Sequence, residues 1–168
     1  TARSLREVEV TGSGDIDMPD WTGADLVAWV RGSGDIALEN VESDSIALNI
    51  DGSGRLDAAG LQAREVRISI NGSGPVEVAT VNADTLDIEI NGSGDVKVNG
   101  GQAQREVIRI HGSGSSDTRE LESQEADVAV QASGSAALRV RESLQATIGG
   151  SGDVRYYGDP TVSQSDSG

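Results

Sequence analysis

The sequence predicts an all-β protein: a single-stranded parallel β-helix, or solenoid, of about eight coils with about 20 residues each. Two observations predict this fold. The tripeptide Gly-Ser-Gly recurs every 20 residues from Gly12 to Gly112, continues as ASG at 132–134 and returns at Gly150. Within each repeat, apolar residues alternate with polar ones, which is typical of a strand with one buried face. Crossovers between parallel strands are right-handed as a rule, so we expect a right-handed solenoid.

The first element of each repeat is a strand of about five residues that leads into the Gly-Ser-Gly corner, as in VRISI at 66–70. Two of its positions are apolar in every repeat. They are Val8, Val10, Ala28, Val30, Leu48, Ile50, Ile68, Ile70, Ile88, Ile90, Ile108, Ile110, Val128, Val130, Ala146 and Ile148. Stacked at the ~4.8 Å spacing of neighbouring strands, these positions form aliphatic columns in a lumen too narrow for Phe, which the chain lacks.

The second element is the corner itself. Its glycines indicate either a backbone with positive φ or a close approach to the coil above, where a Cβ would be costly. The central serines form a hydroxyl column, as at Ser53, Ser73 and Ser93. A catalytic serine is needed only once, and a phosphate cradle would need a following Lys and a helix, so we interpret this column as structural.

A second strand and a looser segment complete the repeat. The strand carries apolar residues four and six positions after the corner begins, and these weaken in repeats six and seven. The looser segment holds a small residue in six of the repeats: Ser43, Ala63, Ala83, Ala103, Ser123 and Ser143. Beyond Pro160 the alternation stops, so we expect a β-solenoid domain at 1–158 and a C-terminal tail or linker at 159–168.

Several strings resemble one known family. GSGD followed by Ile or Val stands at 12–16, 32–36, 92–96 and 150–154, INGSG at 70–74 and 90–94, and YYGDP at 156–160. Together they resemble the bacterial GIN-domain family, the putative auto-transporter adhesin head domain, across essentially the whole chain. The resemblance implies a right-handed β-helix, export to the bacterial envelope and no established enzymatic activity. The Asp column is interrupted at Arg55, Pro75, Ser115 and Ser135, so no single-residue function is carried over.

Composition excludes several classes of protein. The chain has 13 Lys and Arg against 28 Asp and Glu, a net charge of -15 and a pI near 4.2, so nucleic acid is not an expected partner. It has no Cys, which excludes disulfides and thiolate metal sites. No window has the ~18 apolar residues of a membrane span, and we expect any targeting peptide to lie outside this sequence.

The candidate binding residues are Trp29, Val27 and Trp21. Trp29 is on the outward side of its strand and shares that side with Val27, while Trp21 falls nearby in the looser segment. An exposed Trp with an apolar neighbour suits a sugar ring or a protein partner, although the same residues could pack beneath an N-terminal cap. At the opposite end, Tyr156 and Tyr157 are expected to close the core.

An acidic stripe and one histidine are the other candidates. The stripe comprises Asp15, Asp17, Asp35, Asp57, Glu77, Asp95, Asp117 and Asp153, which could bind Ca²⁺ or form a solvated face that discourages aggregation. His111 is a possible general base but stands in a corner column of polar residues, where Asn71 and Asn91 suggest an amide ladder. We expect no catalytic residue, no specific metal site and no cofactor.

We therefore predict a non-enzymatic module of the cell envelope, exported to the periplasm or surface, which binds a protein or glycan through its solenoid faces. One alternative is a carbohydrate-active or acyl-transfer enzyme on the same scaffold, which would rely on His111 or the acidic stripe. The other is a self-assembling scaffold whose ends stack. An enzyme needs a concave pocket with converging polar groups, an adhesin an exposed patch, and a scaffold bare terminal coils.

Overall fold

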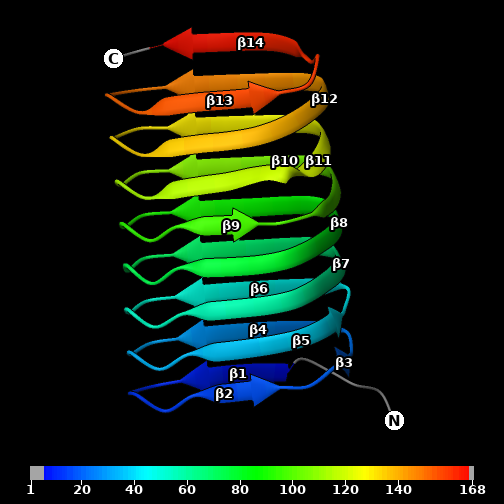
Figure 1. Ribbon diagram of the computed structural model, residues 1–168, viewed down its shortest axis with the longest axis vertical. Helices are drawn as coiled ribbons and strands as arrows, with labels where there is room; N and C mark the ends of the chain where they lie inside the picture. The colour runs from blue at the N-terminus through cyan, green and yellow to red at the C-terminus, as the bar shows by residue number, and fades with distance from the viewer. Residues whose placement is uncertain (1–5, 167–168) are drawn as a thin grey trace.

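A computed structural model describes residues 6–166 and confirms the predicted fold. Its 14 strands form one continuous sheet with parallel pairing throughout, wound into a solenoid of about eight coils. In Figure 1 the nearer strands run to the right and the farther ones return to the left as the chain climbs, which makes the solenoid right-handed. Within the described range no helix is long and apolar enough to cross a membrane.

The chain alternates between two faces of this flattened solenoid, with the Gly-Ser-Gly corners along one side (Figure 1). They are β1 (Arg6–Val10), β2 (Ile16–Met18), β3 (Trp21–Thr22), β4 (Asp25–Val30), β5 (Ile36–Glu42), β6 (Ser45–Ile50), β7 (Leu56–Ile70), β8 (Val76–Ile90), β9 (Val96–Val98), β10 (Gly101–Ile110), β11 (Ser115–Val130), β12 (Ser135–Ile148), β13 (Asp153–Tyr157) and β14 (Thr161–Asp166).

The register places each residue beside the one 20 positions further on. Leu48 pairs with Ile68, Ile68 with Ile88, and Ile88 with Ile108. Because identical positions stack, the β-branched side chains form the unbroken inward columns that the alternation predicts. The repeat of 18 residues near the end is absorbed by register shifts between β11 and β12.

Six positions of a full coil point into the core. In the coil of β7 they are Leu56, Ala58, Leu61, Val66, Ile68 and Ile70, all buried. Val66 is buried, as the alternation in VRISI predicts, but the column of Leu61 was not among the predicted ones. A looser segment was expected between these two residues. Instead β7, β8, β11 and β12 run through the bend as continuous strands.

The corner glycines are required mainly by close approach. A Cβ on Gly32 or Gly52 would overlap the backbone of the glycine 20 residues earlier. Among the described residues, the first glycine of the corner has a positive φ only at Gly12 (115°) and Gly150 (100°). Of the two reasons expected for glycine, close backbone contact between coils therefore applies along most of the rod.

The C-terminal end carries an additional strand where a tail was expected. β14 pairs in parallel with β12, and its six residues are exposed. Its Gln164 and Asp166 lie in register with Ala146 and Ile148, so polar residues follow two apolar columns. Tyr156 continues the column of Leu138 and is 46% exposed at this end. That the core-forming domain ends near residue 158 stays a prediction.

Candidate functional site

Trp29 and Val27 lie on the outward face of β4, as the alternation predicts. Both are partly exposed, and Trp29 stands between Glu9 of β1 and Asn49 of β6. The Arg31 guanidinium lies over the Trp29 ring, 4.4 Å from its centroid. We call Val27, Trp29 and Arg31 the Trp29 patch.

The Trp29 patch is held in place by ion pairs. Arg31 donates from Nη1 to Glu9 Oε1 at 3.1 Å, and its Nε lies 3.9 Å from Asp51 Oδ2. A guanidinium stacked on an indole contributes about 0.5–1 kcal/mol at an exposed site. Because Arg31 covers part of the indole, the patch presents an aromatic edge and a cation together, a pair of residue types enriched at protein interfaces.

Trp21 does not join this patch. Its side chain is only 8% exposed and belongs to the apolar core, in register with Val41. Gly23 lies against the indole so closely that a Cβ there would overlap the ring. The sequence placed Trp21 in a looser segment because its inward column, which continues through Val41 and Leu61, was not recognised.

Members of the acidic stripe form hydrogen bonds with the backbone of the next coil. Asp15 Oδ1 accepts the Asp35 N–H at 2.9 Å, Asp35 Oδ1 accepts the Arg55 N–H at 2.8 Å, and Asp95 Oδ1 accepts the Ser115 N–H at 2.9 Å. These carboxylates therefore satisfy corner backbone donors. Residues 6–166 contain no cluster of three or more His, Cys, Asp or Glu side chains suited to holding a metal ion.

His111 lies exposed in a corner column of polar side chains. Its Nδ1 is 3.2 Å from Gln131 Oε1, and in the coils below it Asn91 Nδ2 donates to Asn71 Oδ1 at 3.0 Å. Asn71 in turn donates to Asp51 Oδ1 at 3.0 Å. The predicted amide ladder is confirmed, and it places polar neighbours around His111.

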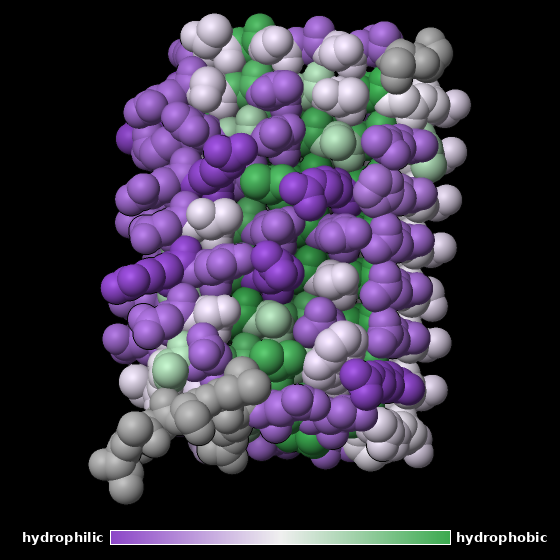
Figure 2. All heavy atoms as spheres, turned by 180° about the vertical axis from the view of Figure 1, so that it is seen from behind, coloured by the Kyte–Doolittle hydropathy of each residue, from purple (hydrophilic) through white to green (hydrophobic). Residues whose placement is uncertain are grey.

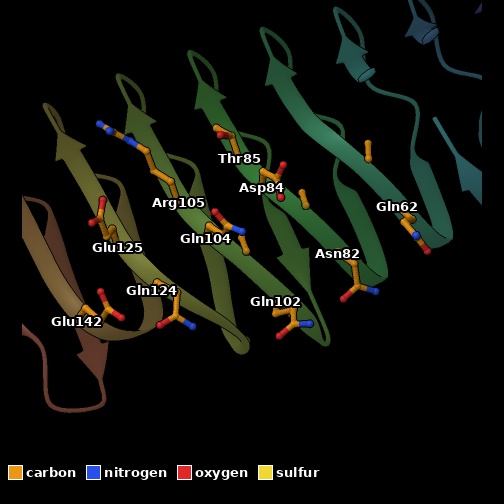
Figure 3. Close-up of a pocket in the computed structure, with 13 residues that line it drawn as sticks. Gln62, Asn82, Asp84, Thr85, Gln102, Gln104, Arg105, Gln124, Glu125 and Glu142 are labelled. Carbon is orange, nitrogen blue, oxygen red and sulfur yellow. The ribbon is translucent and has the colours of Figure 1, made fainter. Parts of the chain in front are cut away.

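A groove follows the bend opposite the Gly-Ser-Gly corners, and the sequence analysis did not identify it. Its central hollow has a volume of about 820 Å³. Figure 3 shows two rows of polar side chains there, one containing Gln62, Asn82 and Gln102 and the other containing Asp84 and Gln104. The small-residue column of the sequence lies between these rows, at Ala63, Ala83 and Ala103. We call this feature the bend groove, and its signal in the sequence was that column.

A buried polar cluster interrupts the core beneath β10 and β11. Glu106 is fully buried in an inward column between Leu86 and Ala126. Thr118 Oγ1 donates to its Oε1 at 2.5 Å and Ser123 Oγ to its Oε2 at 3.2 Å. Burial raises the pKa of Glu106 to about 7, although both hydrogen bonds act to lower it.

The two hydroxyls also have alternative acceptors. Thr118 Oγ1 lies 3.3 Å from the Ala137 carbonyl oxygen, and Ser123 Oγ lies 2.9 Å from that of Arg139. Each hydroxyl has one proton, so it can donate fully either to the Glu106 carboxyl group or to the backbone carbonyl oxygen of β12. The sequence contains a signal for this cluster, because Glu106 stands 20 residues after Leu86 in an otherwise apolar column.

Comparison with known protein families gives a match over most of the chain. The family model described as "Putative auto-transporter adhesin, head GIN domain" matches residues 1–99 and 46–160, which together span nearly the whole chain. Neither a curated protein nor a solved structure matches the chain.

Proposed function

The chain belongs to the family of putative auto-transporter adhesin head GIN domains, and from this premise we propose that it is an exported, non-enzymatic adhesion module. Its contact with a protein or glycan partner would be made on the solenoid faces. The observation that carries the proposal is the Trp29 patch, where a partly exposed indole and a guanidinium are fixed on a flat, rigid sheet. The patch supplies a physical means for the adhesion that the family name implies.

The rod supports this function through repetition. Outward positions recur in register from coil to coil, so a partner that lies along the rod can contact several coils at once. Figure 2 shows the face seen from behind covered mainly with hydrophilic side chains, with hydrophobic residues visible between their rows. Such a surface stays hydrated until a partner engages it.

The enzymatic alternative would need His111 to face an acceptor hydroxyl. The neighbouring side chains of its corner column are instead amides, Gln131 and Asn91. General base catalysis requires convergence on one reacting proton, which an exposed ladder does not provide. His111 is therefore best explained as one member of the polar corner column, paired with Gln131.

The proposal is tested with the purified chain on a glycan array and on an envelope-protein array, each with Ca²⁺ and with chelator. We expect selective binding that Trp29→Ala reduces by roughly tenfold, as loss of an aromatic contact at an interface does. Tyr157→Ala is the matched control, because Tyr157 is 42% exposed in the terminal coil. Equal loss in both variants, or binding unaffected by Trp29→Ala, contradicts the patch assignment.

A further inference from the structure

We propose that the bend groove is a binding site for an extended, uncharged glycan chain that lies along the axis of the rod. This inference adds to the proposed function a site built from other residues than the Trp29 patch. It rests on the groove's length, the chemistry of its walls, its charge and its direction relative to the strands.

The central hollow of about 820 Å³ crosses several successive coils, because residues from Gln62 to Glu142 line it. A hollow of about 440 Å³ lies on the other side of Gln62 and Asn82, and a third of about 340 Å³ lies beyond Arg105 and Glu125. These side chains separate the neighbouring hollows from the central one, so the proposed site is the central hollow. A site of this length suits a polymer better than a small molecule.

The walls carry groups that match hydroxyls. Gln62, Asn82 and Gln102 are exposed in successive coils, and each amide offers both a donor and an acceptor. They recur at the inter-strand spacing of ~4.8 Å, which is close to the length of one sugar unit in an extended chain. Between the rows, the small side chains of Ala63 and Ala83 leave room for a sugar ring to approach the sheet.

Charge selects against anionic ligands. The central hollow contains the carboxylates of Asp84, Glu125 and Glu142 but only one cation, Arg105, among its lining residues. The whole chain carries a net charge of -15, which repels polyanions at longer range. A neutral glycan avoids this repulsion and can use the carboxylates as acceptors for its hydroxyls.

The direction of the groove excludes a peptide that binds by strand addition. A peptide that binds by strand addition needs an open sheet edge. In the groove, the strands are paired on both sides, as Ala83 is with Ala63 and Ala103, and the ligand crosses them. Recognition therefore falls to side chains, and a hydroxyl-rich chain can form hydrogen bonds with every coil it crosses.

The test is calorimetric titration of the full chain with neutral β-linked glucan oligosaccharides of increasing length, and with oligogalacturonates of matched length. We expect affinity for the neutral series to rise with chain length, because each coil adds a contact, and to exceed that for the anionic series. Ala83→Arg should fill the groove and lower affinity by at least roughly tenfold. The paired substitution Asn82→Ala with Gln102→Ala should lower it without adding bulk.

A matched control separates this inference from the proposed function. Ala137→Arg places the same side chain on a partly exposed outward alanine of β12, outside the groove, and should leave glucan binding unchanged. Absence of glucan binding, preference for the anionic series, or equal loss in Ala83→Arg and Ala137→Arg would overturn the groove assignment, whatever the Trp29 patch binds.

Discussion

Glu106 shows how one residue can change the pH response of an otherwise apolar core. It replaces an aliphatic side chain in a column shared with Leu86 and Ala126, and two hydroxyls solvate it. With its pKa raised from 4.5 to about 7, the folded chain holds this proton more tightly than the unfolded chain does. The contribution of Glu106 to stability is therefore complete below about pH 4.5 and is lost as the pH rises through about 7.

Glu106→Gln should remove this dependence, because the amide is neutral at every pH. Its oxygen can accept from one of the two hydroxyls while its NH2 donates to the other, whose own proton can go to a β12 carbonyl oxygen. A shift from 4.5 to about 7 corresponds to about 3 kcal/mol between acid and alkaline limits. We expect the variant to gain stability over the parent at pH 8 and little at pH 4. The free energy of unfolding in urea, measured for both chains at pH 4 and pH 8, tests this expectation. An equal change at the two pH values would refute the raised pKa of Glu106.

At the scale of the element, the repeated corner controls how closely two coils approach. A Cβ on Gly74 would overlap the carbonyl oxygen of Gly54, whereas a Cβ on Gly14 would meet nothing within 4 Å. Gly14→Ala is therefore a matched control at the same corner position in the first coil. The pair separates the effect of close contact from that of the glycine itself.

Gly74→Ala should cost on the order of 2–4 kcal/mol, since the neighbouring backbone must shift, while Gly14→Ala should change stability by about 0.5 kcal/mol or less. Thermal unfolding followed by circular dichroism measures both. Similar melting temperatures for the two variants would mean that the corner has enough freedom to accept a methyl group.

The sequence predicts the strands and corners well because their signals are local and recur in every coil. The bend is harder to predict, since Ala63 and Ala83 interrupt the alternation while Leu61 and Val66 on either side of them point inward. Trp21 stands 20 and 40 residues before Val41 and Leu61, and this spacing indicates that its side chain points into the core. The bend groove is a different case, because it depends on how side chains diverge at a bend that the sequence does not define.

At the scale of the whole molecule, the ends of the rod decide whether coils of different copies can stack. In a solenoid, the edge strand of a terminal coil is a site where another chain can pair, which invites association. β14 provides polar residues at one such edge, with Gln164 and Asp166 in the columns of Ala146 and Ile148. This arrangement disfavours the self-assembling alternative, because stacking would bury those polar groups.

Truncation after residue 158 should reverse this protection. Without β14, Leu144 and Ala146, which are now buried, would lie at an open apolar edge. We expect the full chain to be monomeric and the truncated chain to associate as concentration rises, measured by light scattering after size exclusion. A truncated chain that stays monomeric and equally stable would show that β14 does not protect the end.

The direction of the hydrogen bonds has a mechanical consequence. Because each strand pairs with the coil above and below it, as β7 does with β8, the backbone hydrogen bonds point along the rod. Tension applied between the two termini loads them in series and peels the coils apart one after another. Tension borne by a chain lying across many coils is instead divided among them. An adhesion head built in this way resists detachment best when its tether and its ligand do not pull on opposite ends.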